Sequence, residues 1–174
     1  MKLSPGTRLA PLALHAISGA SVALPDPGSH FTHLQFRRFA GCPICNLHLH
    51  AMAARNTDIR AAGIRQLAVF HSSADEMRQY QAQLPFDCIA DPDKRLYRQF
   101  GVESHWLAAL HPQAMLAGLR GLLLTRRLPG KIENGIAGLP ADFLLNGEGK
   151  VIAAHYGSHA DDHWSVDTLL ALAR

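Results

Sequence analysis

The chain has 174 residues, of which 48% are hydrophobic and 18% are charged. That length and composition suit one compact domain, residues 1–174, with a hydrophobic core, and they exclude an intrinsically disordered chain. The 17 basic residues exceed the 14 acidic ones by a formal charge of +3. They form no long block of like charge, so nucleic acid is not expected as a partner.

The first residues contain no apolar stretch of the length of a secretory signal, because Pro5, Gly6 and Arg8 interrupt them. No segment reaches the roughly 20 apolar residues that span a bilayer, so the membrane is not expected as a partner. The chain has 3 cysteines, which are too few for the disulfide scaffold of a small secreted protein. We therefore expect a protein of the reducing cytoplasm.

The first part of the chain predicts a β-hairpin followed by a strand and a helix. Residues 9–17 and 20–24 read as strands that turn at Ser18-Gly19, and residues 31–39 read as the next strand. A helix is expected from Pro43, since a proline at the first helical position removes an N–H that would have no partner. Its inner face is marked by Cys45, Leu49, Met52, Asn56 and Ile59. Gly63 is a typical helix stop.

The middle of the chain continues the alternation of strands and helices. Residues 64–71 are apolar and strand-like. Ser73 and Glu76 have the spacing of a capping box, which predicts the start of a helix with its inner side chains at Met77, Tyr80 and Leu84. Residues 86–90 predict another strand, and residues 91–101 a short helix.

The last part predicts an insertion, a second hairpin and a final helix. Residues 103–138 read as a helical insertion, within which residues 112–128 have the pattern of an amphipathic helix. Residues 141–145 and 151–156 flank a turn at 146–149, and Ser165 caps the final helix. Strands that alternate with helices predict an α/β fold, in which helices flank a central sheet and the crossovers are right-handed.

Cys42-Pro43-Ile44-Cys45 is the motif that carries chemistry. Two cysteines at this spacing can form and reopen a small disulfide. Cys42 precedes a helix, whose N-terminus favours a thiolate through its partial positive charge and its free N–H groups. Cys45 lies one turn later on the inner face. We therefore expect Cys42 to be the exposed, attacking sulfur and Cys45 the sheltered, resolving one.

Other interpretations of the two cysteines stay open at this point. They are compatible with a purely structural role, or with a copper or zinc site completed by one of the nearby histidines His48, His50 and His71. A site of that kind belongs to a metal-binding protein without redox turnover. Haem attachment is excluded, because Asn46 occupies the position where the CxxCH motif requires histidine.

Three segments resemble a known family. Residues 36–47, around the CxxC motif, together with residues 69–73 and 139–144, resemble bacterial peroxiredoxin-like proteins of the alkyl hydroperoxide reductase and thiol-specific antioxidant superfamily. The resemblance covers most of the chain apart from residues 103–138. It implies a thioredoxin-like fold with a central mixed sheet, an N-terminal β-hairpin and the helical insertion.

The resemblance also implies roles for individual residues. Cys42 corresponds to the attacking cysteine and Cys45 to the resolving one, while Pro43, Leu139 and Pro140 are expected to contact the substrate. Pro140 corresponds to the cis-proline that faces the CxxC motif in thioredoxin-like proteins, where the Leu139 backbone is free to pair with an extended substrate. The implied substrate is a peroxide or a protein disulfide, and the implied electron donor is a thiol reductant of the thioredoxin or glutathione type. No cofactor and no metal are implied.

The chain departs from the usual peroxiredoxin pattern in two places. Gln35 and Phe39 occupy the positions of the proline and the threonine that precede the attacking cysteine in typical peroxiredoxins. The arginine usually found before the late strand is absent from that position. Arg37 or Arg38 is a candidate substitute, but strand alternation points them to opposite faces, so at most one faces the site. The residues therefore fit thiol–disulfide exchange as well as peroxide reduction.

The remaining candidates have simpler interpretations. Cys88 alternates with Phe86 and Ala90, which predicts a buried core cysteine. We expect His48 to be a partly exposed polar residue. The leucine-rich segment 112–128 is expected to serve as a packing helix or as the contact of a homodimer.

Overall fold

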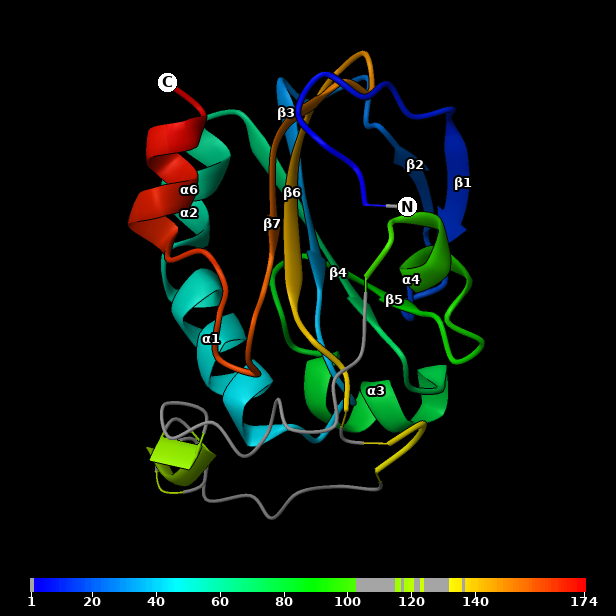
Figure 1. The fold of residues 1–174 in the computed structure, drawn as a ribbon, viewed down its shortest axis with the longest axis vertical. Helices are drawn as coiled ribbons and strands as arrows, with labels where there is room; N and C mark the ends of the chain where they lie inside the picture. The colour runs from blue at the N-terminus through cyan, green and yellow to red at the C-terminus, as the bar shows by residue number, and fades with distance from the viewer. Residues whose placement is uncertain (1, 103–114, 117, 121–122, 124–131, 136) are drawn as a thin grey trace.

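The computed structural model describes residues 2–102, 115–116, 118–120, 123, 132–135 and 137–174. At its centre is a five-stranded sheet formed by β3 (Phe31–Phe36), β4 (Ile64–Phe70), β5 (Asp87–Ala90), β6 (Ala141–Asn146) and β7 (Val151–Tyr156). Its spatial order is β5-β4-β3-β6-β7 (Figure 1). β3 and β4 are parallel to each other, as are β4 and β5, whereas β6 is antiparallel to both β3 and β7. The prediction of a mixed α/β sheet is therefore confirmed.

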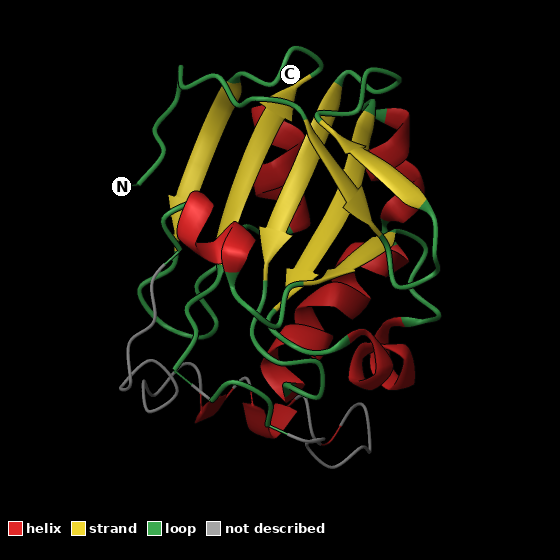
Figure 2. Cartoon of the chain, turned by 90° about the vertical axis from the view of Figure 1, so that its right-hand side faces the viewer, coloured by secondary structure: helices red, strands yellow, loops and turns green. Residues whose placement is uncertain are grey.

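The helices pack on the sheet as the alternation predicts. Figure 1 shows α1 (Pro43–Ala54), α2 (Asn56–Ala61) and α6 (Val166–Leu172) beside one face of the sheet. α3 (Ala74–Gln81) shares the hydrophobic core of that face with α1, as the common cluster of Leu49, Met77 and Ala68 shows. The short helix α4 (Arg95–Gln99) lies on the opposite face (Figure 2), where Tyr97 packs with Phe36 and Val69. The sheet is thus covered on both faces.

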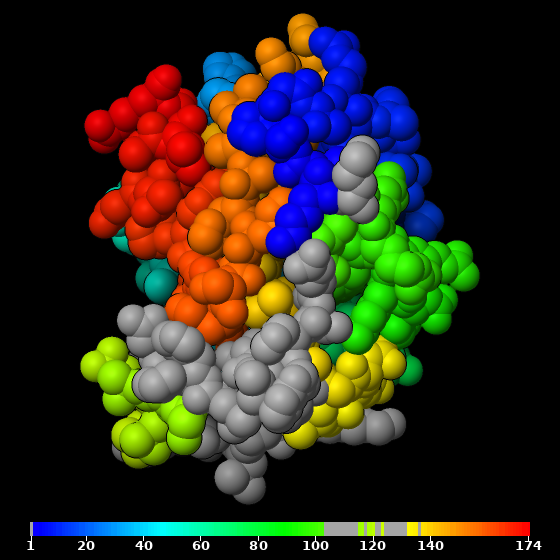
Figure 3. Space-filling view, viewed as in Figure 1, coloured from blue at the N-terminus to red at the C-terminus, as the bar shows by residue number. Residues whose placement is uncertain are grey.

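The N-terminal hairpin is also confirmed. β1 (Leu12–His15) pairs antiparallel with β2 (Ser21–Leu24), and Gly19 supplies the positive φ of 91° that the turn requires. The chain before the hairpin runs along β7: the backbone N–H of Gly6 donates to Val151, and that of Leu9 donates to Gly149. Figure 3 shows these blue residues beside the orange ones of β7, so the start of this edge strand is paired.

The helix after Pro43 differs from its prediction. Its inner face is as expected, since Cys45, Leu49 and Met52 are buried, but the helix ends at Ala54. Arg55 has φ −111° and ψ 22°, and a separate helix, α2, begins at Asn56. The Arg55 side chain binds Asp58 and Asp167, which anchors the break to α6. Residue periodicity does not reveal such a break, because both helices keep the same apolar face.

The predicted insertion at 103–138 falls largely outside the described residues, including most of the expected helix 112–128. Within the part of it that is described, Gly118 lies over Ile44 in the first turn of α1. Ser73 caps α3 and Ser165 caps α6, each accepting a backbone N–H from three residues further on, which confirms both predicted caps. None of the described helices has the length and apolar character to cross a bilayer.

Candidate active site

Cys42 lies at the carboxyl end of β3, directly before α1. It is the N-cap residue of that helix with an extended backbone, and Pro43 occupies the first helical position. The Cys42 carbonyl accepts the N–H of Asn46, while its own N–H donates to Phe39. This arrangement aims the free N–H groups of the first helical turn at the Cys42 sulfur. The predicted location of the motif at a helix start is confirmed.

Several groups set the protonation of Cys42. Burial raises the pKa of its thiol, but a hydrogen bond from Cys45, the charge of Arg38 and the backbone N–H groups of Cys45 and Ile44 lower it, to a net value of about 7. A thiol with that pKa is roughly half ionised at pH 7, against about 3% for an unperturbed cysteine. Cys42 is therefore the sulfur that carries negative charge in the reduced pair.

Cys45 has the opposite character. Burial, the hydrogen bond that it donates to Cys42 and the negative charge of Cys42 raise its pKa well above the ordinary value. The charge of Arg38 and the backbone N–H of the same residue oppose this rise. The structure holds both cysteines as free thiols. The pair is thus asymmetric in charge, as a mechanism with one attacking and one resolving sulfur requires.

The predicted asymmetry in exposure is wrong. Cys42 is 0% exposed and Cys45 is 2% exposed, so neither sulfur is at the surface. The prediction took the start of a helix to be an exposed position. Cys42 instead packs in a hydrophobic cluster with Phe39, Ala40 and Ile44. Its local electrostatics, rather than its exposure, distinguish it from Cys45.

Arg38 touches both sulfurs. Its guanidinium Nη1 lies 3.7 Å from the Sγ of Cys42, and its backbone N–H donates to the Sγ of Cys45 at 3.5 Å. Its side chain also lies over the Phe39 ring and is 3% exposed. Of the two candidate arginines, Arg38 therefore faces the cysteines. The prediction that at most one does so is confirmed.

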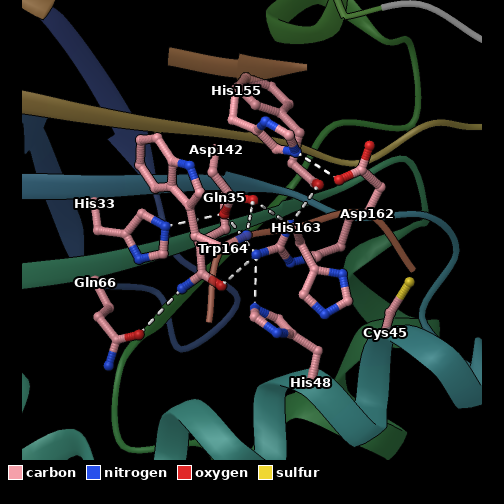
Figure 4. Close-up of polar contacts among 12 residues, drawn as sticks. His33, Gln35, Cys45, His48, Gln66, Asp142, His155, Asp162, His163 and Trp164 are labelled. Atoms are coloured by element: carbon pink, nitrogen blue, oxygen red, sulfur yellow. Dashed lines mark hydrogen bonds and ion pairs between the residues drawn. The ribbon is translucent and has the colours of Figure 1, made fainter. Parts of the chain in front are cut away.

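Arg37 belongs instead to a buried polar cluster, in which it contacts Gln35, His48 and Asp142. Figure 4 shows these three side chains together with those of His33 and His163, which complete the cluster. Nη2 of Arg37 donates to Asp142 at 2.7 Å and to Gln35 at 2.8 Å. Asp142 also binds His33 at 3.0 Å. Charges of opposite sign are thus paired inside the protein, where isolated charges are costly.

His48 belongs to this polar cluster and not to the cysteine site. Its Nε2 lies 2.8 Å from Nη2 of Arg37, and its ring contacts that of His163 with centroids 3.7 Å apart. Burial, followed by the charges of Arg37 and His163, lowers its pKa well below the usual range. The prediction of a partly exposed residue is wrong, because the side chain fills the space between α1 and the sheet, where it is 7% exposed.

The metal-site interpretation required a histidine beside the cysteines. Among the residues that the structure describes, no group of three histidine, cysteine or carboxylate side chains is arranged to hold a metal ion. His71 is buried against Gly138 and Tyr97, and His50 is exposed. The cysteine pair therefore has Arg38, and not a histidine, as its charged neighbour.

The prediction of a cis bond at Pro140 is wrong. The cis peptide bond in the described residues is Leu24–Pro25, and the Leu139–Pro140 bond is trans. The Pro140 carbonyl accepts the N–H of Gly157 at 2.9 Å, so Pro140 continues the extended pairing of β6 with β7. With a trans bond, the segment at Pro140 stays extended and pairs with the residues that follow β7.

The three predicted substrate contacts lie near the cysteines to different degrees. Pro43 follows Cys42 directly and is half-buried. Leu139 and Pro140 are buried, and they follow Gly138, which packs against the side chains of His71 and Arg38. The segment before β6 is therefore connected to the site through Arg38. The substrate-binding roles of these three residues stay predictions.

Cys88 is a core residue, as predicted. It is 2% exposed in the cluster that also holds Phe70 and Met77. Burial, together with the charge of Asp87, raises the pKa of its thiol to about 12. At neutral pH it is protonated and unreactive.

Sequence reasoning missed the polar cluster and Tyr97. His33, Gln35 and Arg37 alternate along β3 and its end, and Asp142 stands between the apolar residues Ala141 and Phe143 of β6. Charged and polar residues in a buried strand indicate that charges are paired inside the protein. The sequence does not show which residues form the pairs, because the partners come from distant parts of the chain. Tyr97 lies on a short helix within a polar stretch, and no local pattern marks it as a neighbour of the cysteines.

The comparisons with known proteins agree with this geometry. The family model of the AhpC/TSA antioxidant enzymes matches residues 51–159, which is more than half of the chain. The chain belongs to the AhpC/TSA antioxidant enzyme family. The matched residues begin after Cys45, so the roles of the two cysteines rest on the geometry of the site. As a member of the AhpC/TSA family, the protein is a thiol-dependent oxidoreductase.

Solved structures share its fold. The peroxidoxin BcpB of Mycobacterium tuberculosis has a TM-score of 0.71 at 15% identity, with 99% of this chain and 97% of that chain covered. A protein of Chlorobium tepidum assigned as the thiol:disulfide interchange protein DsbE has a TM-score of 0.64 at 22% identity, with coverages of 99% and 100%. Peroxiredoxin Q of Xanthomonas campestris has a TM-score of 0.67 at 21% identity, with 93% of this chain and 89% of that chain covered. No curated protein matches the chain. The expected thioredoxin-like fold is confirmed.

Arg38 gives the first testable prediction. Replacing it with methionine removes the charge beside Cys42 while keeping a long side chain against Phe39. We expect the pKa of Cys42 to rise from about 7 towards its ordinary value. The test measures the rate at which iodoacetamide alkylates Cys42 over a range of pH. At pH 7 this rate should be several-fold lower than in the wild type, because the thiolate is the reactive form. Arg60→Met, at an exposed position of α2, is the matched control. An unchanged Cys42 titration in Arg38→Met contradicts the role of this arginine.

The buried histidines predict loss of stability in mild acid. Burial, and to a lesser extent nearby positive charges, lowers the pKa of His71 to about 4 and that of His163 to about 3. In the unfolded chain these histidines titrate near 6.5, so below that pH the unfolded state binds protons that the folded state does not. The free energy of unfolding should therefore fall as the pH drops from about 7 to 4. Each buried histidine contributes up to about 1.4 kcal/mol per pH unit.

Urea denaturation at several pH values between 7 and 4.5 measures how steeply the free energy of unfolding changes with pH. In His163→Gln the plot of unfolding free energy against pH should be less steep, by up to one proton, because the pKa of His163 is lowered to about 3 in the folded protein. Equal stability at pH 7 and pH 5 would show that the buried histidines take up protons in the folded state.

Proposed function

We propose that Cys42 and Cys45 form the redox centre of this enzyme, in which Cys42 attacks the substrate and Cys45 resolves the oxidised intermediate. The observation that carries the proposal is the contact of Arg38 with both sulfurs, at 3.7 Å to Cys42 and 3.5 Å to Cys45. A cation beside one sulfur and a backbone N–H on the other fit a pair that exchanges negative charge during turnover.

The primary substrate that we propose is a hydroperoxide. The Cys42 thiolate attacks the terminal peroxide oxygen and the O–O bond breaks, so that the sulfur becomes a sulfenic acid and the leaving alkoxide takes a proton to give an alcohol. Arg38 stabilises the thiolate and the negative charge that develops on the peroxide oxygens. Peroxide is reduced by two electrons and Cys42 is oxidised by two.

Cys45 then closes the cycle. Its sulfur attacks the Cys42 sulfenic acid, the S–O bond breaks and one water leaves, which produces the Cys42–Cys45 disulfide. A dithiol reductant of the thioredoxin type, or two molecules of a glutathione-type thiol, returns the pair to the reduced state by disulfide exchange. The low pKa of Cys42, about 7, makes it the better leaving group when an external thiol opens the disulfide at Cys45.

A second candidate reaction is disulfide exchange with a protein substrate. Phe39 favours it, because this buried aromatic side chain stands where typical peroxiredoxins carry the threonine that holds the peroxide. In this reaction Cys42 attacks one sulfur of a substrate disulfide and Cys45 resolves the mixed disulfide, with release of a substrate dithiol.

Single-turnover kinetics with Cys45→Ser tests the proposal. Mixing the reduced variant with one equivalent of hydroperoxide should give sulfenic acid at Cys42 and no disulfide, since the resolving sulfur is gone. Parallel mixing with a small disulfide should give a mixed disulfide at Cys42. Comparing the two rate constants identifies the preferred substrate class. If Cys42 reacts with neither reagent while Cys88, the other cysteine of this variant, does, the assignment of the attacking sulfur is wrong.

A further inference from the structure

We propose that Tyr97 is a positioning residue for Cys45 and that it acts through the peptide group between Arg37 and Arg38. The Tyr97 hydroxyl lies within hydrogen-bond distance of two carbonyl oxygens, those of Arg37 and Val69, and it is closer to that of Arg37, to which it donates. The N–H of that same peptide group, which belongs to Arg38, donates to the Sγ of Cys45 at 3.5 Å. One peptide group therefore connects a tyrosine hydroxyl on one side with a cysteine sulfur on the other.

This connection has a physical consequence. A hydrogen bond to a peptide oxygen draws electron density towards that oxygen and makes the N–H of the same group a stronger donor, by about 10–30% for each bond. A stronger donor stabilises the thiolate of Cys45 more than its neutral thiol. Tyr97 thus favours the form of Cys45 that attacks the oxidised Cys42.

The surroundings of Tyr97 hold its hydroxyl in place. The side chain is 4% exposed, and its ring packs edge-to-face on Phe36 with centroids 5.0 Å apart. Asp91 accepts three backbone N–H groups at the start of α4, including that of Tyr97. Burial and the neighbouring charges of Cys45 and Asp91 raise the pKa of the phenol well above 10, so it stays a donor. The helix therefore aims a protonated hydroxyl at the peptide.

Two further groups in the described part of the chain act on the charge of Cys45. Cys42 raises the pKa of Cys45, and Arg38 lowers it from the end of β3. Tyr97 is the group that approaches from α4. The inference rests on the proposed role of Cys45 as the resolving sulfur, but it concerns Cys45 alone and makes no claim on the reactivity of Cys42.

The test replaces Tyr97 with phenylalanine in a chain whose single thiol is Cys45, made by Cys42→Ser and Cys88→Ala. The pKa of Cys45, measured by alkylation against pH, should rise by about 0.5 pH unit relative to the same chain with Tyr97. With the native cysteines, Tyr97→Phe should slow disulfide closure at pH 7 about threefold and leave the rate of Cys42 oxidation unchanged.

Tyr156→Phe is the matched control. Its hydroxyl donates to the Phe100 carbonyl at 2.7 Å and not to the Arg37 carbonyl, and its ring packs on Phe143 in the same core. Difluorotyrosine at position 97 is a second variant that keeps the side chain in place. Because its hydroxyl is a stronger donor, it should shift the pKa of Cys45 in the opposite direction, downwards.

An unchanged Cys45 titration in Tyr97→Phe, or an equal shift in Tyr156→Phe, overturns the inference. So does an upward shift with difluorotyrosine, since that result reports a structural disturbance. Failure of the proposed function has a different signature: Cys42 then remains unoxidised by hydroperoxide and by disulfide in the otherwise native chain.

Discussion

Replacing Cys42 with serine is expected to lower turnover with hydroperoxide and with disulfide substrates by at least ~10³-fold. The serine hydroxyl is not ionised near neutral pH, so neither Arg38 nor the helix start can create a nucleophile there. The fold should persist, because serine is close in volume to cysteine. Steady-state assays with hydroperoxide and a thiol reductant, at matched protein concentration, measure the loss.

The control for this variant is Cys88→Ala. Cys88 is a buried cysteine with a pKa of about 12, and its removal should leave turnover within about twofold. Full activity of Cys42→Ser, or loss of activity in Cys88→Ala with the fold intact, contradicts the placement of the redox centre.

Asp142→Asn is expected to destabilise the protein by about 3–5 kcal/mol. The Asp142 carboxylate is fully buried and binds Arg37, His33 and the backbone N–H of Trp164. Asparagine keeps the shape but removes the charge, which leaves the Arg37 cation buried without a counter-ion. The loss is a large part of the total of roughly 5–15 kcal/mol that stabilises a typical domain. Urea denaturation at pH 7 measures it.

The pH of that measurement matters. Although burial raises the pKa of Asp142, the charge of Arg37 and the hydrogen bond with His33 lower it well below the usual range. Its contribution is therefore complete above the unfolded pKa of about 3.9, and it is lost only as the pH falls through the lower folded value. The full effect of Asp142→Asn is expected at neutral pH.

Glu148→Gln is the matched control. Glu148 forms an ion pair with Arg8 at 3.0 Å, but both side chains are largely exposed. Solvent screens such a pair, so its loss should cost less than about 1 kcal/mol. If Asp142→Asn lowers the free energy of unfolding by less than about 1 kcal/mol, the buried polar cluster contributes little to stability.

The order of elements was predictable because each carries a local signal. Alternation and apolar runs predict the strands, and Pro43, Ser73 and Ser165 mark the starts of α1, α3 and α6. The break at Arg55 carried no such signal, since ion pairs with Asp58 and Asp167 stabilise it from outside the helix. Local chemistry therefore predicts where helices begin better than where they are interrupted.

The site was predictable in its residues but not in its environment. The spacing of Cys42 and Cys45 locates the motif, and strand alternation separates Arg38 from Arg37. The burial of Cys42 and the Tyr97 contact depend on packing between segments far apart in the chain. The resemblance supplied a cis bond at Pro140 that this chain does not have. Contacts between distant segments set the pKa values of the two thiols and the hydrogen bonds that reach them, and only the folded structure shows these contacts.

The central claim is that Cys42 and Cys45 together form the redox centre. Mass spectrometry of tryptic peptides, after the reduced protein has reacted with one equivalent of hydroperoxide and its remaining thiols have been alkylated, tests it most directly. We predict an intramolecular disulfide between Cys42 and Cys45, with Cys88 recovered in its reduced, unoxidised form. Oxidation at Cys88, or a Cys42–Cys45 pair that stays fully reduced while peroxide is consumed, would contradict the account.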